Sequence, residues 1–103
     1  MEALVDGKLA SPGLYQQQMT FTPLGPFAGY GLGTERLGDF IGHNGWIPGF
    51  TGIATRDPTR GVTIAVQFNK SVDEQYQVNN VILLELTNVL FPGEMPWWGA
   101  EFP

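Results

Sequence analysis

Three short segments rich in branched and aromatic residues follow one another closely, and this succession restricts the possible folds more than any other feature. The segments are 40–47, 50–56 and 61–69. In the last, every second position is apolar, which is typical of a strand with one buried face: Val62, Ile64, Val66 and Phe68. Strands joined by so few residues pair with their neighbours in the chain, so the sequence predicts an antiparallel sheet.

Turn residues separate these segments. Pro48-Gly49 lies between the first two, and Asp57-Pro58-Thr59-Arg60-Gly61 suits a hairpin before the third. A further strand is predicted at 29–36, where the glycines imply close approach of another backbone. Strands are thus expected across 29–69. This explains why the chain has 14 Gly and 8 Pro among 103 residues without low complexity.

A helix is predicted at 71–91. Ser71 and Glu74 have the spacing of a capping box, and Pro92-Gly93 ends the pattern. Apolar residues recur at helical spacing between them: Val78, Val81, Ile82, Leu86, Val89 and Leu90. Leu83 and Leu84 widen this stripe, so more than one side of the helix is expected to be buried. The predicted fold class is therefore α+β, an antiparallel sheet with a C-terminal helix packed on one face.

The two ends of the chain are predicted to be less regular. Residues 1–28 are interpreted as a helix end that stops at Gly7, a short helix from Ser11 to Met19, and a loop over 20–28. Residues 92–103 form an aromatic tail. Its aromatic side chains either dock on the surface of their own domain or form a binding platform: Trp97, Trp98 and Phe102.

Composition excludes several classes of function. The net charge of -5, from five basic and ten acidic residues, is unsuited to nucleic acid. The longest aliphatic run, Val81 to Leu84, is too short to span a membrane. Absence of cysteine excludes disulfides, zinc-thiolate sites and thiol nucleophiles, and residues 1–6 do not resemble a signal peptide. The compartment stays undetermined. A charged fraction of only 15% indicates surfaces that another chain or domain covers.

Candidate chemistry centres on the single histidine, His43. A lone histidine in a strand is usually a packed or surface residue, and no second His, Cys or carboxylate cluster gives it the spacing of a metal site. Gly31 and Gly33 lack the third glycine and the following helix of a phosphate loop. Taken alone, these residues predict a small acidic α+β domain without metal or cofactor.

Several short motifs, in order, carry a resemblance to a known family. They are Leu9-Ala10-Ser11-Pro12, Gly29-Tyr30-Gly31-Leu32-Gly33, Gly42-His43-Asn44-Gly45 with Pro48-Gly49-Phe50, Asp57-Pro58, and Gly61 to Val66 with Asn69. Over most of residues 3–90 the chain resembles the carboxy-terminal part of serine β-lactamases and D-alanyl-D-alanine carboxypeptidases. Class C β-lactamases, DD-carboxypeptidases and the esterases of this fold are the nearest. The resemblance implies that 1–103 is one partial domain of a β-lactamase/transpeptidase-like fold.

Family members build their site from an S-x-x-K nucleophile motif, a Y-x-N element and a K-T-G or H-T-G strand. His43-Asn44-Gly45 matches the third. Neither Ser11 nor Ser71 is followed by Lys three positions later, and no tyrosine is followed by Asn two positions later. The resemblance thus implies a hydrolase segment with the oxyanion-side strand but no nucleophile, which alone is inactive.

The resemblance also implies a role for each matching residue. The backbone N–H of Trp46 would donate to the oxyanion, and Gly45 would let the substrate carbonyl approach. His43 would supply a proton or positive potential. Asn44, in place of the family's usual threonine, would bind a substrate carboxylate, and the bulky Trp46 would narrow the groove.

The implied partner is the missing N-terminal portion of the parent protein, or a second copy of this chain, because the family's partner strand for 61–69 is absent and leaves an unpaired edge. Two other hypotheses stay open. One is a non-catalytic binding or assembly module that uses the same sheet with Trp46, Trp97 and Trp98, and the other is a structural domain without a ligand.

Overall fold

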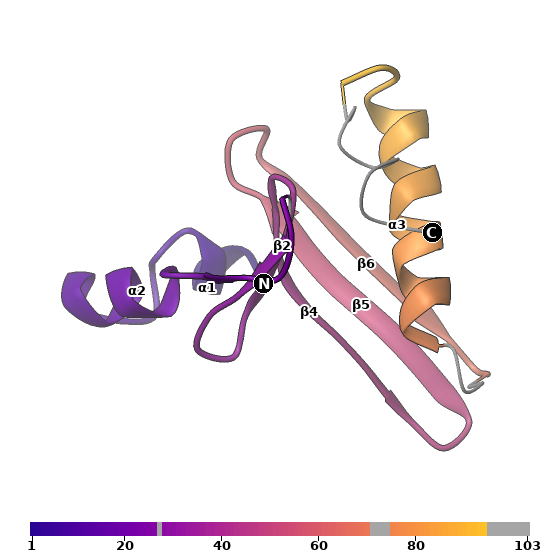
Figure 1. Ribbon diagram of the computed structural model, residues 1–103, viewed down its shortest axis with the longest axis horizontal. Helices are drawn as coiled ribbons and strands as arrows, with labels where there is room; N and C mark the ends of the chain where they lie inside the picture. The colour runs from indigo at the N-terminus through magenta and orange to yellow at the C-terminus, as the bar shows by residue number, and fades with distance from the viewer. Residues whose placement is uncertain (27, 71–74, 95–103) are drawn as a thin grey trace.

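The computed structural model describes residues 1–26, 28–70 and 75–94 and has an α+β architecture, as predicted (Figure 1). Six antiparallel strands form one sheet in chain order, β1 to β6, so every strand pairs with its neighbour in sequence. The elements are α1 (Glu2–Val5), α2 (Pro12–Gln18), β1 (Thr22–Pro23), β2 (Ala28–Tyr30), β3 (Glu35–Leu37), β4 (Phe40–Ile47), β5 (Phe50–Asp57), β6 (Val62–Phe68) and α3 (Gln75–Leu90).

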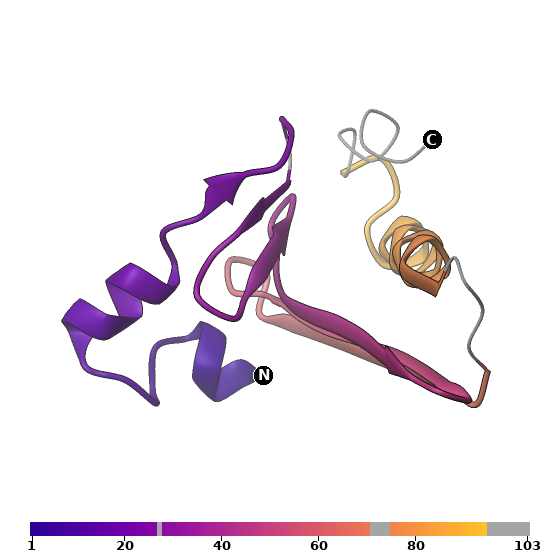
Figure 2. The same ribbon diagram turned by 60° about the horizontal axis from the view of Figure 1, so that its bottom comes forward.

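The three long strands β4, β5 and β6 match the three predicted segments, and α3 covers one of their faces (Figure 2). Residues directly opposite in the register share a face, as does every second residue along a strand. Ile53 lies opposite Asn44 and Val66, so Phe40 and Ile64, at even spacings along β4 and β6, share its face toward α3. These side chains form the core with Leu83 of the helix. Val62 and Val66 pack against it, which confirms the predicted buried face of β6.

The prediction of one strand over 29–36 is wrong, because the chain reverses there. The Gly31 N–H donates to the Thr34 carbonyl at 2.7 Å, and Gly33 takes a φ of 74°, a conformation that favours glycine. Two short strands, β2 and β3, pair across this turn. The predicted loop over 20–28 also contains β1, which pairs with β2.

Near the N-terminus the predicted helix signals hold. The Ser11 hydroxyl accepts from the Leu14 N–H at 3.4 Å as the cap of α2, and Gly7 follows α1 with a φ of 78°. Arg56 fastens α1 to the sheet, since its Nε and Nη2 donate to the two carboxylate oxygens of Asp6 at 2.9 and 3.0 Å. That pair holds the pKa of Asp6 below its ordinary range.

Over residue 79 and residues 81–90, where the side chains of α3 are described, the helix buries a narrower side than the sequence predicts. The fully buried positions there are Asn79, Leu83 and Thr87, spaced four apart. Three residues of the predicted apolar stripe are instead exposed: Val81, Val89 and Leu90. Because the sheet contacts only one side of α3, the described residues leave the other apolar side uncovered. The capping box and the aromatic tail fall on 71–74 and 95–103, outside the described residues.

No helix in the described ranges is both long and apolar enough to cross a membrane.

Candidate functional site

The predicted site residues His43, Asn44, Gly45 and Trp46 lie consecutively on β4, before its hairpin to β5. The strand β3 pairs with β4 only as far as Gly42, so the side of β4 away from β5 has no strand beside it from His43 onward within the described part of the chain. We call residues 43–47 on that side the open edge. Among the described residues it is the stretch of β4 without a second neighbouring strand.

The hairpin fixes the direction of the backbone groups at this edge. Ile47 and Phe50 flank the two-residue turn Pro48-Gly49 and exchange both backbone hydrogen bonds. In an antiparallel ladder such hydrogen-bonded pairs alternate with pairs whose backbone N–H and carbonyl groups point away from the partner strand. Trp46, opposite Thr51, therefore directs its N–H and carbonyl toward the open edge, and Asn44, opposite Ile53, does the same.

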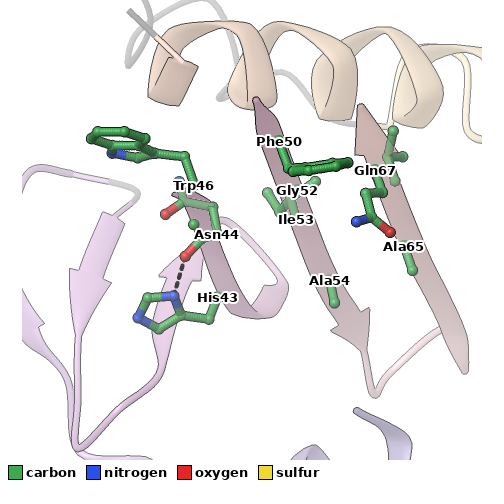
Figure 3. Close-up of a pocket in the computed structure, with 11 residues that line it drawn as sticks. His43, Asn44, Trp46, Phe50, Gly52, Ile53, Ala54, Ala65 and Gln67 are labelled. Atoms are coloured by element: carbon green, nitrogen blue, oxygen red, sulfur yellow. Dashed lines mark hydrogen bonds between the residues drawn. The ribbon is translucent and has the colours of Figure 1, made fainter. Parts of the chain in front are cut away.

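A hollow of about 540 Å³ adjoins the open edge on the face of the sheet opposite α3, and all four predicted residues line it (Figure 3). Its volume is within the range of small-molecule sites. Small residues from three strands form its floor: Gly45, Gly52, Ala54 and Ala65. Phe50 and Gln67 also line it. The absence of bulky side chains on this floor leaves room for a flat substrate group.

The two glycines of β4, Gly42 and Gly45, occupy positions of different kinds. A Cβ at Gly42 would meet the Thr55 Cα at 2.7 Å, so the close contact with β5 requires glycine there. A Cβ at Gly45 would meet no described atom within 4 Å. The fold thus gives no packing reason for Gly45, whereas a ligand in the hollow would.

His43 is held by two contacts. Its Nδ1 lies in hydrogen-bond contact with the Asn44 carbonyl oxygen, drawn as the dashed line in Figure 3. Its Nε2 lies 2.7 Å from the hydroxyl of Tyr30, and the two rings meet edge to face with centroids 5.8 Å apart. The imidazole is exposed and lies beside the open edge.

Glu35 is the acidic neighbour of this histidine. It pairs with Gly42 in the register, and one of its carboxylate oxygens is buried without a hydrogen-bond partner among the described residues. Burial raises the pKa of Glu35 above its ordinary value, and the charge of His43 opposes that rise. The site therefore contains a partly buried carboxyl group, with one oxygen unpartnered among the described residues, whose pKa the charge of His43 influences.

Tyr30 and Glu35 were missed by sequence reasoning. With 29–36 taken as one strand, the two residues stand far apart along it. The turn at Gly31 to Thr34 places them opposite each other, beside Gly42 and His43. The sequence signal was present, since Gly-Leu-Gly-Thr is a turn-forming run.

The other candidate groups lie elsewhere. Ser11 caps α2, and Ser71 falls outside the described residues. Within the described ranges no three His, Cys, Asp or Glu side chains gather as they would around a metal ion.

Replacing Glu35 by Gln should raise the melting temperature at neutral pH. A carboxyl whose pKa is raised by folding favours the folded state when protonated, and this stabilisation is lost as the pH rises through the folded pKa. The advantage of Glu35→Gln should shrink as the pH falls through the raised folded pKa and should be gone below the carboxyl's ordinary 4.5. Thermal unfolding monitored by circular dichroism across this range checks the sign. An equal advantage at every pH would contradict the role of ionisation.

No protein-family model and no curated protein matches this chain.

Proposed function

We propose that these residues form the oxyanion-side sheet of a serine hydrolase of the β-lactamase and D-alanyl-D-alanine carboxypeptidase type. The serine nucleophile and its lysine would come from residues outside these 103. Acyl transfer requires N–H donors directed at the oxygen that gains charge in the transition state. The direction of the Trp46 backbone N–H toward the open edge, above a floor of small residues, supports this proposal most strongly.

Two of the predicted roles have a supporting feature. A substrate carbonyl can approach the open edge past Gly45, where a side chain would have projected into the hollow. His43 lines the same hollow and would supply a proton when charged. The role of Asn44 has no such feature, because its register with Ile53 places its side chain on the α3 side of the sheet, the face away from the hollow.

The chain by itself should not hydrolyse acyl substrates, because covalent catalysis needs a nucleophile and a base as well as an oxyanion donor. The measurement is turnover of nitrocefin and of a p-nitrophenyl ester by the purified 103-residue chain. We expect no rate above that of buffer. Hydrolysis that a serine-directed acylating agent inhibits would contradict the assignment of the nucleophile to another segment.

The proposed partner is the amino-terminal portion of the parent protein or, in its absence, a second copy of this chain. The described residues place no strand on the outer edge of β6. The exposed side of α3, with Val81, Val89 and Leu90, supports the same proposal, because apolar side chains there would be covered by a neighbouring element.

Ala65→Pro should reduce self-association of the isolated chain. In the ladder Asp57 pairs with Val62, and alternation then directs the Ala65 N–H away from β5, so proline removes a donor only from the outer edge. Ala65→Thr keeps that donor and is the control. Sedimentation at about 10 to 100 micromolar should show association for the unsubstituted 103-residue chain and for the control, and less association for Ala65→Pro. A monomeric unsubstituted chain would contradict the proposal.

A non-catalytic assembly module is the second candidate, because the tip of the β4–β5 hairpin exposes three large apolar side chains: Trp46, Ile47 and Phe50. Gly45 separates the two candidates. A module that binds through the hairpin tip tolerates a methyl group at Gly45, whereas an oxyanion site does not.

A further inference from the structure

The two contacts of His43 determine which ring nitrogen carries hydrogen. A backbone carbonyl only accepts hydrogen bonds, so Nδ1, which contacts the Asn44 carbonyl, must be the donor. A neutral imidazole has one N–H, which leaves a lone pair on Nε2. The Tyr30 hydroxyl, 2.7 Å from Nε2, then donates its hydrogen to that lone pair.

We propose that Tyr30 is a positioning residue that holds the neutral imidazole of His43 as its Nδ1–H tautomer. The Nε2 lone pair is directed at the Tyr30 hydroxyl. This contact also provides a route for a proton to the ring: the hydroxyl oxygen accepts one proton while its own hydrogen passes to Nε2. Tyr30 ends with the same number of hydrogens, and His43 becomes an imidazolium with N–H at both nitrogens.

The charges around the ring fit this assignment. Glu35 of β3 is the carboxylate that interacts with the charge of His43, and it would balance the imidazolium. Arg36 of β3 donates to the Gly38 carbonyl at 3.1 Å, and Arg56 of β5 binds Asp6. Directly beside His43, β5 presents Ala54, and β6 follows with Ala65. In the part of the chain described, Tyr30 is thus the titratable side chain in contact with the ring, and Glu35 is the carboxyl that interacts with its charge.

The geometry also links the ring to the open edge. The Asn44 carbonyl that accepts from Nδ1 points to the same edge as the Trp46 N–H. The hydrogen bond of the Nδ1–H tautomer therefore holds the ring against this edge. A proton that leaves Nε2 would pass to the Tyr30 hydroxyl, beside the same edge. The catalytic meaning of this delivery rests on the proposed function, but the tautomer itself does not.

Because His43 is the only histidine, its ring nitrogens can be read directly by long-range ¹H–¹⁵N correlation NMR on the labelled 103-residue chain. In mildly alkaline solution we expect Nδ1 at the shift of a protonated nitrogen and Nε2 at that of a nitrogen with a lone pair. Tyr30→Phe should shift the population toward the Nε2–H tautomer, which a free histidine side chain prefers. Tyr15→Phe is the control, since the Tyr15 hydroxyl bonds to the Val5 carbonyl and not to His43.

Two results would overturn the proposal: an Nε2–H tautomer in the unsubstituted 103-residue chain, or unchanged ¹⁵N shifts of the His43 ring in Tyr30→Phe. The first measurement uses no variant, so it tests the proposal even if Tyr30→Phe does not fold. Neither measurement involves hydrolysis. The two proposals can therefore fail separately. An Nδ1–H tautomer that depends on Tyr30 would support the positioning role, and an absence of acyl-transfer activity in the parent protein would reject the proposed function.

Discussion

Gly45→Ala should lower ester hydrolysis by the parent protein about 10²–10³-fold, the size of effect seen when one oxyanion donor is lost. The parent protein is the product of the whole reading frame that contains these residues. The added methyl group would project into the hollow beside the open edge and keep the substrate carbonyl away from the Trp46 N–H. The loss should be in kcat as well as in kcat/KM, because the contact is made in the transition state.

A melting-temperature measurement should distinguish this loss of activity from a loss caused by misfolding. A Cβ at Gly45 has no described neighbour within 4 Å, so the melting temperature of Gly45→Ala should stay near that of the parent. Gly13→Ala, in α2 and equally free of contacts, is the matched control and should keep full activity. Full activity of Gly45→Ala would reject the oxyanion role and favour the assembly module.

Phe40→Ala should destabilise the fold by about 3–5 kcal/mol, the cost of removing a large aromatic side chain from a core. Phe40 begins β4, is 0% exposed and belongs to the core cluster with Ile53 and Leu83. Since domains of this size have only about 5–15 kcal/mol of stability, much of the variant population is expected to be unfolded on heating slightly above room temperature.

Phe50→Ala provides the comparison, because the same side chain is 45% exposed at the start of β5. Phe50→Ala should lower the free energy of unfolding much less than Phe40→Ala does. Urea unfolding followed by circular dichroism gives the free energies of unfolding of both variants. Equal losses for the two variants would show that the core does not lie between β4 and α3.

The long strands and the helix could be predicted because their signals are local. Alternation in 61–69, the Pro48-Gly49 turn and the helical spacing after residue 74 each lie within a few residues. Which residues of α3 are buried could not be predicted, because it depends on the angle at which the helix meets the sheet. The line Asn79, Leu83, Thr87 faces the sheet although two of its members are polar. Asn79 is suited to that place by the hydrogen bond from its amide to the Gly52 carbonyl.

Four of the six site residues could be identified from the sequence. His43, Asn44, Gly45 and Trp46 follow one another in the chain, so a motif could identify them. Tyr30 and Glu35 join them through the turn at Gly31, which the glycine run indicates, and through the register of β2, β3 and β4, which sequence patterns do not encode. The partners of an exposed histidine are set by such long-range pairing.

The central claim is that the Trp46 backbone N–H donates to an oxyanion, and its amide signal tests this most directly. The parent protein, labelled with ¹⁵N-tryptophan, would be treated with a boronate that forms a tetrahedral adduct on the nucleophilic serine. We predict a clear downfield shift of the Trp46 amide proton, with its assignment made by Trp46→Phe. A serine adduct that leaves the Trp46 amide unmoved, or a reading frame that encodes no S-x-x-K ahead of these residues, would contradict the account.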